Sequence, residues 1–231
     1  KNILLNLKIM NKLIYFFLVI GLFLVSSCVD DNKLSPVDIA DAKKDSELQP
    51  LFNEYSAQDS SFVANEGNYV SIVSNGNFLV LPSEEDYQGI EVELEKVLIK
   101  SPSEHTVDGE HFALELQFVH LSPSSSKEIV AVFVVEGQEN SELNKIIPNI
   151  SKRKKTELVQ NLDFYNLFQQ SPEYWTYSGS STNDPFDDAN WYIMKEPIEA
   201  SADQIKKIQN LIGVNDVKQV ELGERIILEN F

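Results

Sequence analysis

The chain has 231 residues, of which 42% are hydrophobic and 10% aromatic, enough for one sizeable core and one domain. Lys and Arg number 19 against 36 Asp and Glu, so the formal net charge is −17. This balance argues against nucleic acid and anionic lipid headgroups as partners, because both attract cationic surfaces. The single cysteine, Cys28, excludes an internal disulfide.

The first residues have the features of an exported lipoprotein. The run from Leu13 to Val25 is apolar, follows a basic residue, and leads through two serines to Cys28. Val-Ser-Ser-Cys resembles the lipobox of bacterial lipoproteins, in which the cysteine is lipidated. A plain signal peptide with an incidental cysteine is the alternative. We therefore divide the chain into an upstream extension (1–9), a lipoprotein signal peptide (10–27), a lipidated tether (28–33) and a folded domain (34–231).

The lipobox resemblance implies a lipid anchor at Cys28 in a bacterial outer membrane. Asp30 and Asp31 follow the cysteine and resemble the acidic export signal of surface lipoproteins. We expect the domain to lie on the cell surface, with a periplasm-facing anchor as the alternative.

Beyond the tether, β-rich runs dominate the chain. Asn75-Gly76 predicts a hairpin turn before a strand over 78–81. Residues 90–100 alternate in polarity and predict a strand of a single parity, with Val92 and Leu94 on the same face as Leu98. The run 127–137 is the most β-rich and predicts a central strand.

Helical signals are few and short. Residues 144–150 and 156–159 each predict a short helix. The clearest helix runs from Ser201 to Leu211, because Ser201 and Gln204 form a capping box and Gly213 follows the last apolar turn.

The stretch 96–121 resembles the α-class carbonic anhydrases, through PSEHTVDG at 102–109 and FALELQFVHL at 112–121. SPVDI at 35–39, YWTYSGSSTNDP at 174–185 and WYIMKEPI at 191–198 resemble further family motifs in the family's order. The resemblance therefore covers about residues 34–228. It implies a mainly β fold, with a central, largely antiparallel twisted sheet of about ten strands and short peripheral helices.

The resemblance also implies a zinc site, yet other side chains occupy its ligand positions. The three zinc histidines of active members fall on Leu98, Lys100 and Gln117. Leucine has no lone pair, lysine is cationic and glutamine offers one weak oxygen, so we expect zinc to be lost and no cofactor to bind. The position of the proton-shuttling histidine holds Asn68, whose amide does not titrate near neutral pH.

Three polar residues of the family's site persist in this chain. Thr182 matches the threonine that bonds the zinc hydroxide, Glu104 the glutamate that orients it, and Glu115 the glutamate that orients the third histidine. We expect them to be relicts of a buried polar network without catalytic function. We also expect the Lys100 ammonium to point into the place of the zinc and to replace part of its charge; the alternative is that it reaches the pocket mouth.

The leading functional expectation is a non-catalytic surface lipoprotein that serves as a binding or scaffold module for an unidentified protein. One alternative is a lyase that hydrates CO₂ with a rebuilt or altered metal site. A second alternative is a small-anion binder that uses the relict pocket, lined by Lys100, Gln117, Val119, Ile129, Thr182 and Trp191. Neither nucleic acid nor a cofactor is expected as a partner.

Overall fold

The computed structural model describes residues 34–82, 89–123, 126–152, 156–168, 170–183, 185–213 and 216–231. All of them belong to one compact unit, Asn32–Phe231. The extension, the signal peptide, the tether and Cys28 lie outside the described residues, so these assignments stay predictions. None of the described helices is long and apolar enough to cross a membrane.

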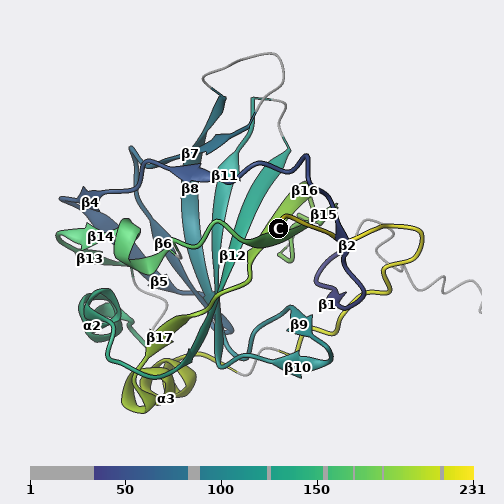
Figure 1. The fold of residues 1–231 in the computed structure, drawn as a ribbon. Helices are drawn as coiled ribbons and strands as arrows, with labels where there is room; N and C mark the ends of the chain where they lie inside the picture. The colour runs from purple at the N-terminus through teal and green to yellow at the C-terminus, as the bar shows by residue number, and fades with distance from the viewer. Residues whose placement is uncertain are drawn as a thin grey trace, which may run out of the picture. The chain divides into compact units, whose positions relative to one another are not determined.

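A thirteen-stranded sheet forms the centre of this unit (Figure 1). Its main path runs through ten strands in the spatial order β13 (Glu157–Val159), β5 (Ser61–Asn65), β6 (Tyr69–Val73), β8 (Ile90–Lys100), β11 (Leu114–Leu121), β12 (Lys127–Glu136), β16 (Asp188–Met194), β15 (Tyr174–Ser180), β18 (Leu228–Glu229) and β2 (Lys43–Lys44). Three strands join beside this path, namely β3 (Phe52–Asn53), β7 (Phe78–Leu81) and β17 (Ile198–Ala200). The mainly β fold expected from the sequence is confirmed, and β12 is central in it.

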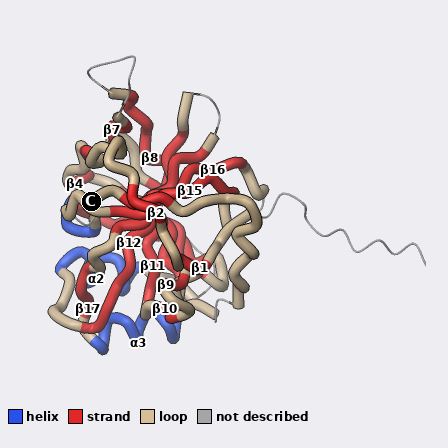
Figure 2. The backbone as a smooth tube through the Cα atoms, turned by 45° about the vertical axis from the view of Figure 1, so that its right-hand side comes forward, coloured by secondary structure: helices blue, strands red, loops and turns tan. Residues whose placement is uncertain are grey.

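The remaining elements are short. Two small sheets contain β1 (Asp38–Ile39), β9 (Thr106–Val107) and β10 (Glu110–His111) in one, and β4 (Ala57–Gln58) and β14 (Leu162–Asp163) in the other. The helical elements are α2 (Ser141–Ile146), η1 (Ile147–Asn149), η2 (Phe164–Leu167) and α3 (Ala202–Leu211). Figure 2 shows α2 and α3 together on one flank of the large sheet.

The large sheet is mixed, which refines the expected largely antiparallel arrangement. β11 runs antiparallel to both β8 and β12, but β12 pairs in parallel with β16 and with β17. β18 and β2 also pair in parallel. These parallel pairs join segments that are far apart in the sequence, as crossover connections require.

The two faces of the sheet bury two different apolar clusters. On β11, Leu116 and Phe118 belong to the larger cluster, whereas Val119 belongs to a smaller one with Leu98, Ile129 and other residues. Successive side chains of a strand point to opposite faces, so Glu115 and Gln117 share the face of Val119. The polar groups singled out in the sequence therefore lie on the side of the smaller cluster.

The single parity expected along 90–100 is wrong. Val92 and Leu94 pack in the larger cluster together with Val97, whereas Leu98 packs in the smaller one. The reason is a register shift: Lys96 pairs with Val119, but Leu94 pairs with the next residue of β11, so one residue of β8 is extra. Such a bulge reverses which parity faces the core.

The three helix predictions have different outcomes. Ser201 accepts from the backbone N–H of Gln204 and the Gln204 side chain accepts from the Ser201 N–H, so the capping box of α3 is confirmed. The short helix at 144–150 corresponds to α2 and η1. The helix expected at 156–159 is wrong, because 157–159 form strand β13 against β5. The conformation of such a short segment depends on its pairing with β5, which the local sequence pattern does not predict.

Candidate functional site

Three neighbouring strands bring the former ligand positions together. On β11, Gln117 pairs with Leu98 of β8, and Glu115 pairs with Lys100. On the other side of β8, Tyr69 of β6 pairs with Lys100. Directly paired residues have adjacent side chains on one face, so this register makes a single cluster of residues that lie far apart in the chain.

Lys100 is buried and bonded within this cluster. Its side chain is 1% exposed, and its Nζ donates to Glu104 Oε1 at 3.0 Å and to Asn183 Oδ1 at 2.6 Å. The same ammonium lies 4.5 Å from the ring centroid of Tyr69, a cation–π distance. The ammonium therefore lies beside the carboxylate, as the charge-replacement hypothesis expects, and does not reach the pocket mouth.

Two of these partners, Asn183 and Tyr69, were not identified in the sequence. Asn183 follows Thr182 in a loop, where local pattern gives no sign that its side chain turns back to β8. Tyr69 lies beside Lys100 because β6 pairs with β8 in this register. The sequence alone does not show which strands pair.

Gln117 has a fixed orientation on the floor of this site. Its Nε2 donates to Glu104 Oε2 at 2.8 Å and to Glu115 Oε1 at 3.0 Å. Ionised carboxylates only accept, so both amide hydrogens point toward them and Oε1 points the other way. There it accepts from the Thr182 hydroxyl at 3.3 Å.

Glu115 is ionised and connects Gln117 to the segment of Glu104 and His105. Its Oε2 accepts from the backbone N–H groups of Glu104 and His105, at 2.7 and 2.9 Å, and its Oε1 lies 2.8 Å from His105 Nδ1. Burial alone would raise the pKa of Glu115, but the interaction with His105 and the hydrogen bonds from His105 and Gln117 outweigh it and lower the pKa to about 2. The three retained polar residues thus form one connected network.

His120 lies on the opposite face and serves packing. Its Nδ1 is 2.9 Å from the Glu128 carbonyl oxygen and its Nε2 is 2.6 Å from the Tyr55 hydroxyl. A carbonyl oxygen only accepts, so Nδ1 carries the proton and Nε2 accepts from Tyr55. Burial lowers the pKa of His120 to about 4. The imidazole is neutral at pH 7 and is engaged at both nitrogens.

A pocket of about 260 Å³ opens beside the cluster. Four of the six predicted pocket residues line it, namely Gln117, Val119, Ile129 and Thr182. Lys100 and Trp191 do not; the Trp191 side chain is buried and donates to the Ser180 carbonyl oxygen at 2.9 Å. Asn68 lies exposed in the turn before β6.

The side chains at the ligand positions do not fit a zinc ion. Leu98 presents carbon, Lys100 presents an ammonium, and Gln117 directs its nitrogen to two carboxylates. Zinc in proteins takes thiolate, imidazole and carboxylate ligands. Within the part of the chain that the structure describes, no three His, Cys, Asp or Glu side chains are grouped to hold a metal ion.

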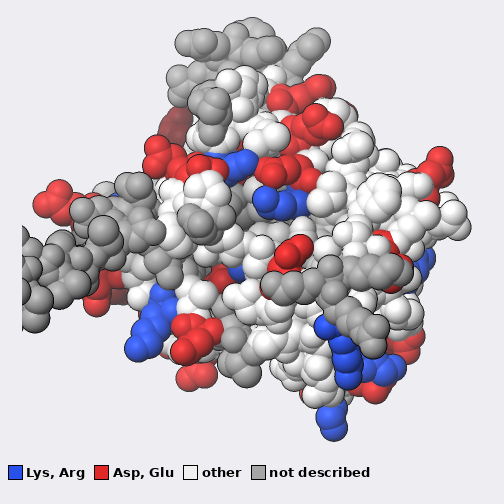
Figure 3. All heavy atoms as spheres, turned by 180° about the vertical axis from the view of Figure 1, so that it is seen from behind, with Lys and Arg blue, Asp and Glu red and all other residues white. Residues whose placement is uncertain are grey.

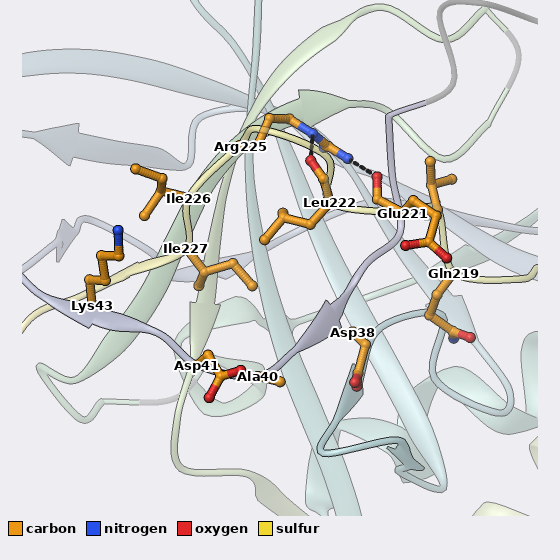
Figure 4. Close-up of a pocket in the computed structure, with 11 residues that line it drawn as sticks. Asp38, Ala40, Asp41, Lys43, Gln219, Glu221, Leu222, Arg225, Ile226 and Ile227 are labelled. Atoms are coloured by element: carbon orange, nitrogen blue, oxygen red, sulfur yellow. Dashed lines mark hydrogen bonds between the residues drawn. The ribbon is translucent and has the colours of Figure 1, made fainter.

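A larger cavity, of about 540 Å³, lies between residues 38–43 and 219–227. Backbone hydrogen bonds bound it, from Val220 N to the Pro36 carbonyl oxygen and from Lys43 N to the Ile227 carbonyl oxygen. Figure 4 shows the guanidinium of Arg225 turned to carbonyl oxygens of its own segment. The lining of this cavity contains both acidic and basic side chains, so it does not point to one ligand class.

Charge is dispersed over the surface. Figure 3 shows acidic side chains around much of one face, with lysines and arginines in small groups among them. Single surface ion pairs contribute little to stability, and the described residues of this face form no broad basic surface for nucleic acid.

Comparison with known proteins gives consistent matches. The family model of the eukaryotic-type carbonic anhydrases matches residues 24–231. Carbonic anhydrase 1 of Oryctolagus cuniculus is 31% identical over 206 residues, which cover 79% of this chain and 87% of the relative. The alpha-carbonic anhydrase of Photobacterium profundum superposes with a TM-score of 0.78 at 28% identity, covering 88% of this chain and 92% of its own. The enzyme from Thermovibrio ammonificans, solved with the inhibitor sulfanilamide, has a TM-score of 0.78 and 29% identity, with coverages of 87% and 88%.

Proposed function

Because the chain belongs to the eukaryotic-type carbonic anhydrase family, we propose that it is a non-catalytic member that acts by binding. The observation that carries this proposal is the buried ion pair of Lys100 and Glu104 in the place where the family resemblance sets zinc. An ammonium has no lone pair for a metal, and it repels a second cation. A zinc ion would have to displace this pair, and of the three family ligand positions only Gln117 would offer it an oxygen.

The network around the pair supports the same proposal. Gln117 bonds to both retained glutamates, and Thr182 bonds to Gln117. Each retained residue therefore has a structural reason to persist without a metal, since a buried polar group that loses its partner is costly.

A second candidate is a lyase that hydrates CO₂ with an altered metal site. The names of the relatives favour it, because the curated relative and both solved neighbours are carbonic anhydrases. The persistence of Glu104, Glu115 and Thr182 is compatible with it as well. It requires metal ligands from residues other than those at the three family positions.

The small-anion binder has less support from the geometry. Its central cation was Lys100, which donates to Glu104 and Asn183 and does not line the pocket. An anion would have to compete with a buried carboxylate for this ammonium.

We propose further that the domain is displayed on a bacterial outer membrane through a lipid on Cys28. The support is the sequence pattern alone, since residues 1–33 lie outside the described part. The partner in this setting is an unidentified protein that the tethered domain captures.

The experiment that separates the first two candidates is elemental analysis of the purified protein together with a CO₂-hydration assay on the same sample. Absence of stoichiometric metal and of hydration in a cooperatively folding protein is the result expected for a binding module. One zinc per chain with hydration above the uncatalysed rate would refute the proposal and establish the lyase.

A further inference from the structure

The pocket beside the Lys100 cluster has two hydrogen-bond acceptors, Gln117 Oε1 and the Thr182 hydroxyl, next to its apolar residues. The Gln117 amide donates its two hydrogens to Glu104 and Glu115, so its Oε1 lies on the side of Thr182. An amide oxygen has two lone pairs, and a threonine hydroxyl that donates one bond still accepts. A ligand head that bonds to Gln117 Oε1 therefore has to donate.

The cations near the pocket are already paired. Lys96 and Lys127 line it, and both bond to Glu95, at 3.1 and 2.8 Å. Asp187 also lines it, so the described lining residues contribute two positive and two negative charges. A lining of balanced charge gives no net attraction to an anion.

The walls of the pocket are apolar on one side. Leu98, Val119 and Ile129 are almost fully buried around it and belong to one cluster. Pockets with apolar walls and a few fixed polar groups bind compact ligands, and the polar groups set the orientation. A volume of about 260 Å³ limits the ligand to a small molecule or one side chain of a partner.

We propose that this pocket selects an uncharged hydrogen-bond donor, such as a primary amide or an alcohol, on a compact apolar body, and rejects a carboxylate of the same shape. The donor head contacts Gln117 Oε1 and Thr182, and the body packs on Leu98, Val119 and Ile129. A carboxylate in the same place would set its own lone pairs against those of Gln117 Oε1. A zinc ion would impose the opposite preference, since a bound cation attracts anions. The inference thus rests on the proposed metal-free site and names its ligand class.

Benzamide and benzoate are a matched pair of probes, because they have the same shape and differ in donor capacity and charge. Titration of each into the purified protein, followed by calorimetry and by NMR of labelled methyl groups, measures the preference. We expect benzamide to bind at least ~tenfold more tightly than benzoate. The methyl shifts should centre on Leu98, Val119, Ile129 and Thr182.

Two variants locate the binding. Val119→Phe fills the pocket and should abolish benzamide binding. Val73→Phe makes the same change at an exposed position of β6 and should leave binding unchanged. If Val119→Phe does not fold, the methyl shifts of the unmodified protein still report the site.

Several outcomes would overturn the inference. Equal or tighter binding of benzoate, no binding of either probe, shifts away from the pocket, or benzamide binding that survives Val119→Phe each contradict it. Metal analysis of the same sample separates this failure from failure of the proposed function. A metal-free, inactive protein that prefers benzoate refutes the ligand class alone, whereas stoichiometric zinc with CO₂ hydration refutes both.

Discussion

Replacing Lys100 by methionine is the most direct perturbation of the cluster. Methionine keeps similar length and volume, so the change removes charge without opening a large cavity. It leaves Glu104 Oε1 without its ammonium donor in a site where both side chains are at most 1% exposed, and it also removes the bond to Asn183. Breaking a buried pair by removing one partner costs about 3–5 kcal/mol.

The assay is urea unfolding at pH 7 with a thermal scan of the same samples. For a domain of this size each kcal/mol corresponds to about 2–4 °C, so the midpoint should fall by roughly 6–20 °C. Lys207→Met is the matched control, because Lys207 pairs with Asp203 at an exposed site of α3. That control should lose at most about 1 kcal/mol.

The double variant Lys100→Met/Glu104→Gln completes the cycle. Removing both charges should recover much of the loss, because no carboxylate is then left without its cation. If Lys100→Met were as stable as the parent, or if the double variant lost the sum of the two single losses, the ammonium would not replace the charge of a metal.

Three further predictions concern metal binding, pH and anchoring. Restoring histidine at Leu98, Lys100 and Gln117 together should give about one zinc per chain by elemental analysis, since Glu115, which the resemblance sets beside the third ligand, is in place; metal content no higher than in the parent would contradict this. Acidification from about pH 6.5 to 4 should cost about 3 kcal/mol of unfolding free energy, because the unfolded chain binds a proton in this range that buried His120, with its pKa of about 4, does not. Urea unfolding across that range should show a smaller loss for His120→Gln, and an unchanged slope would refute this reasoning. Cys28→Ser should move the protein from the membrane fraction to the soluble fraction on immunoblots, and retention in the membrane would argue against a lipid on Cys28.

The sequence predicted those parts of the fold that local chemistry determines. The capping box of Ser201 and Gln204 needs only residues within one helical turn, and the strand at 127–136 needs only its own apolar run. The bulge in β8 was missed because an extra residue in a strand has no sequence pattern of its own. It nevertheless reverses the face to which every later residue of the strand points.

The site was predictable only where a family motif supplied the spacing. Glu104, Glu115 and Gln117 fall in one continuous stretch, and the structure brings them within hydrogen-bonding distance. Asn183 was missed, since its contact with Lys100 joins residues 83 apart in sequence. The orientation of Gln117 also required the structure, because it depends on two acceptors lying on the same side of one amide.

The pairing of β2 with β18 has a consequence for biosynthesis. Lys43 and Lys44 lie beside Leu228 and Glu229, so one of the earliest described strands pairs with a strand that is made far later in synthesis. Asn230 adds to the same edge by accepting from Tyr174 N and donating to the Pro172 carbonyl oxygen. Chains are synthesised at about 5–20 residues per second from the N-terminus. This edge of the sheet therefore closes only after the residues of β18 and Asn230 have left the ribosome.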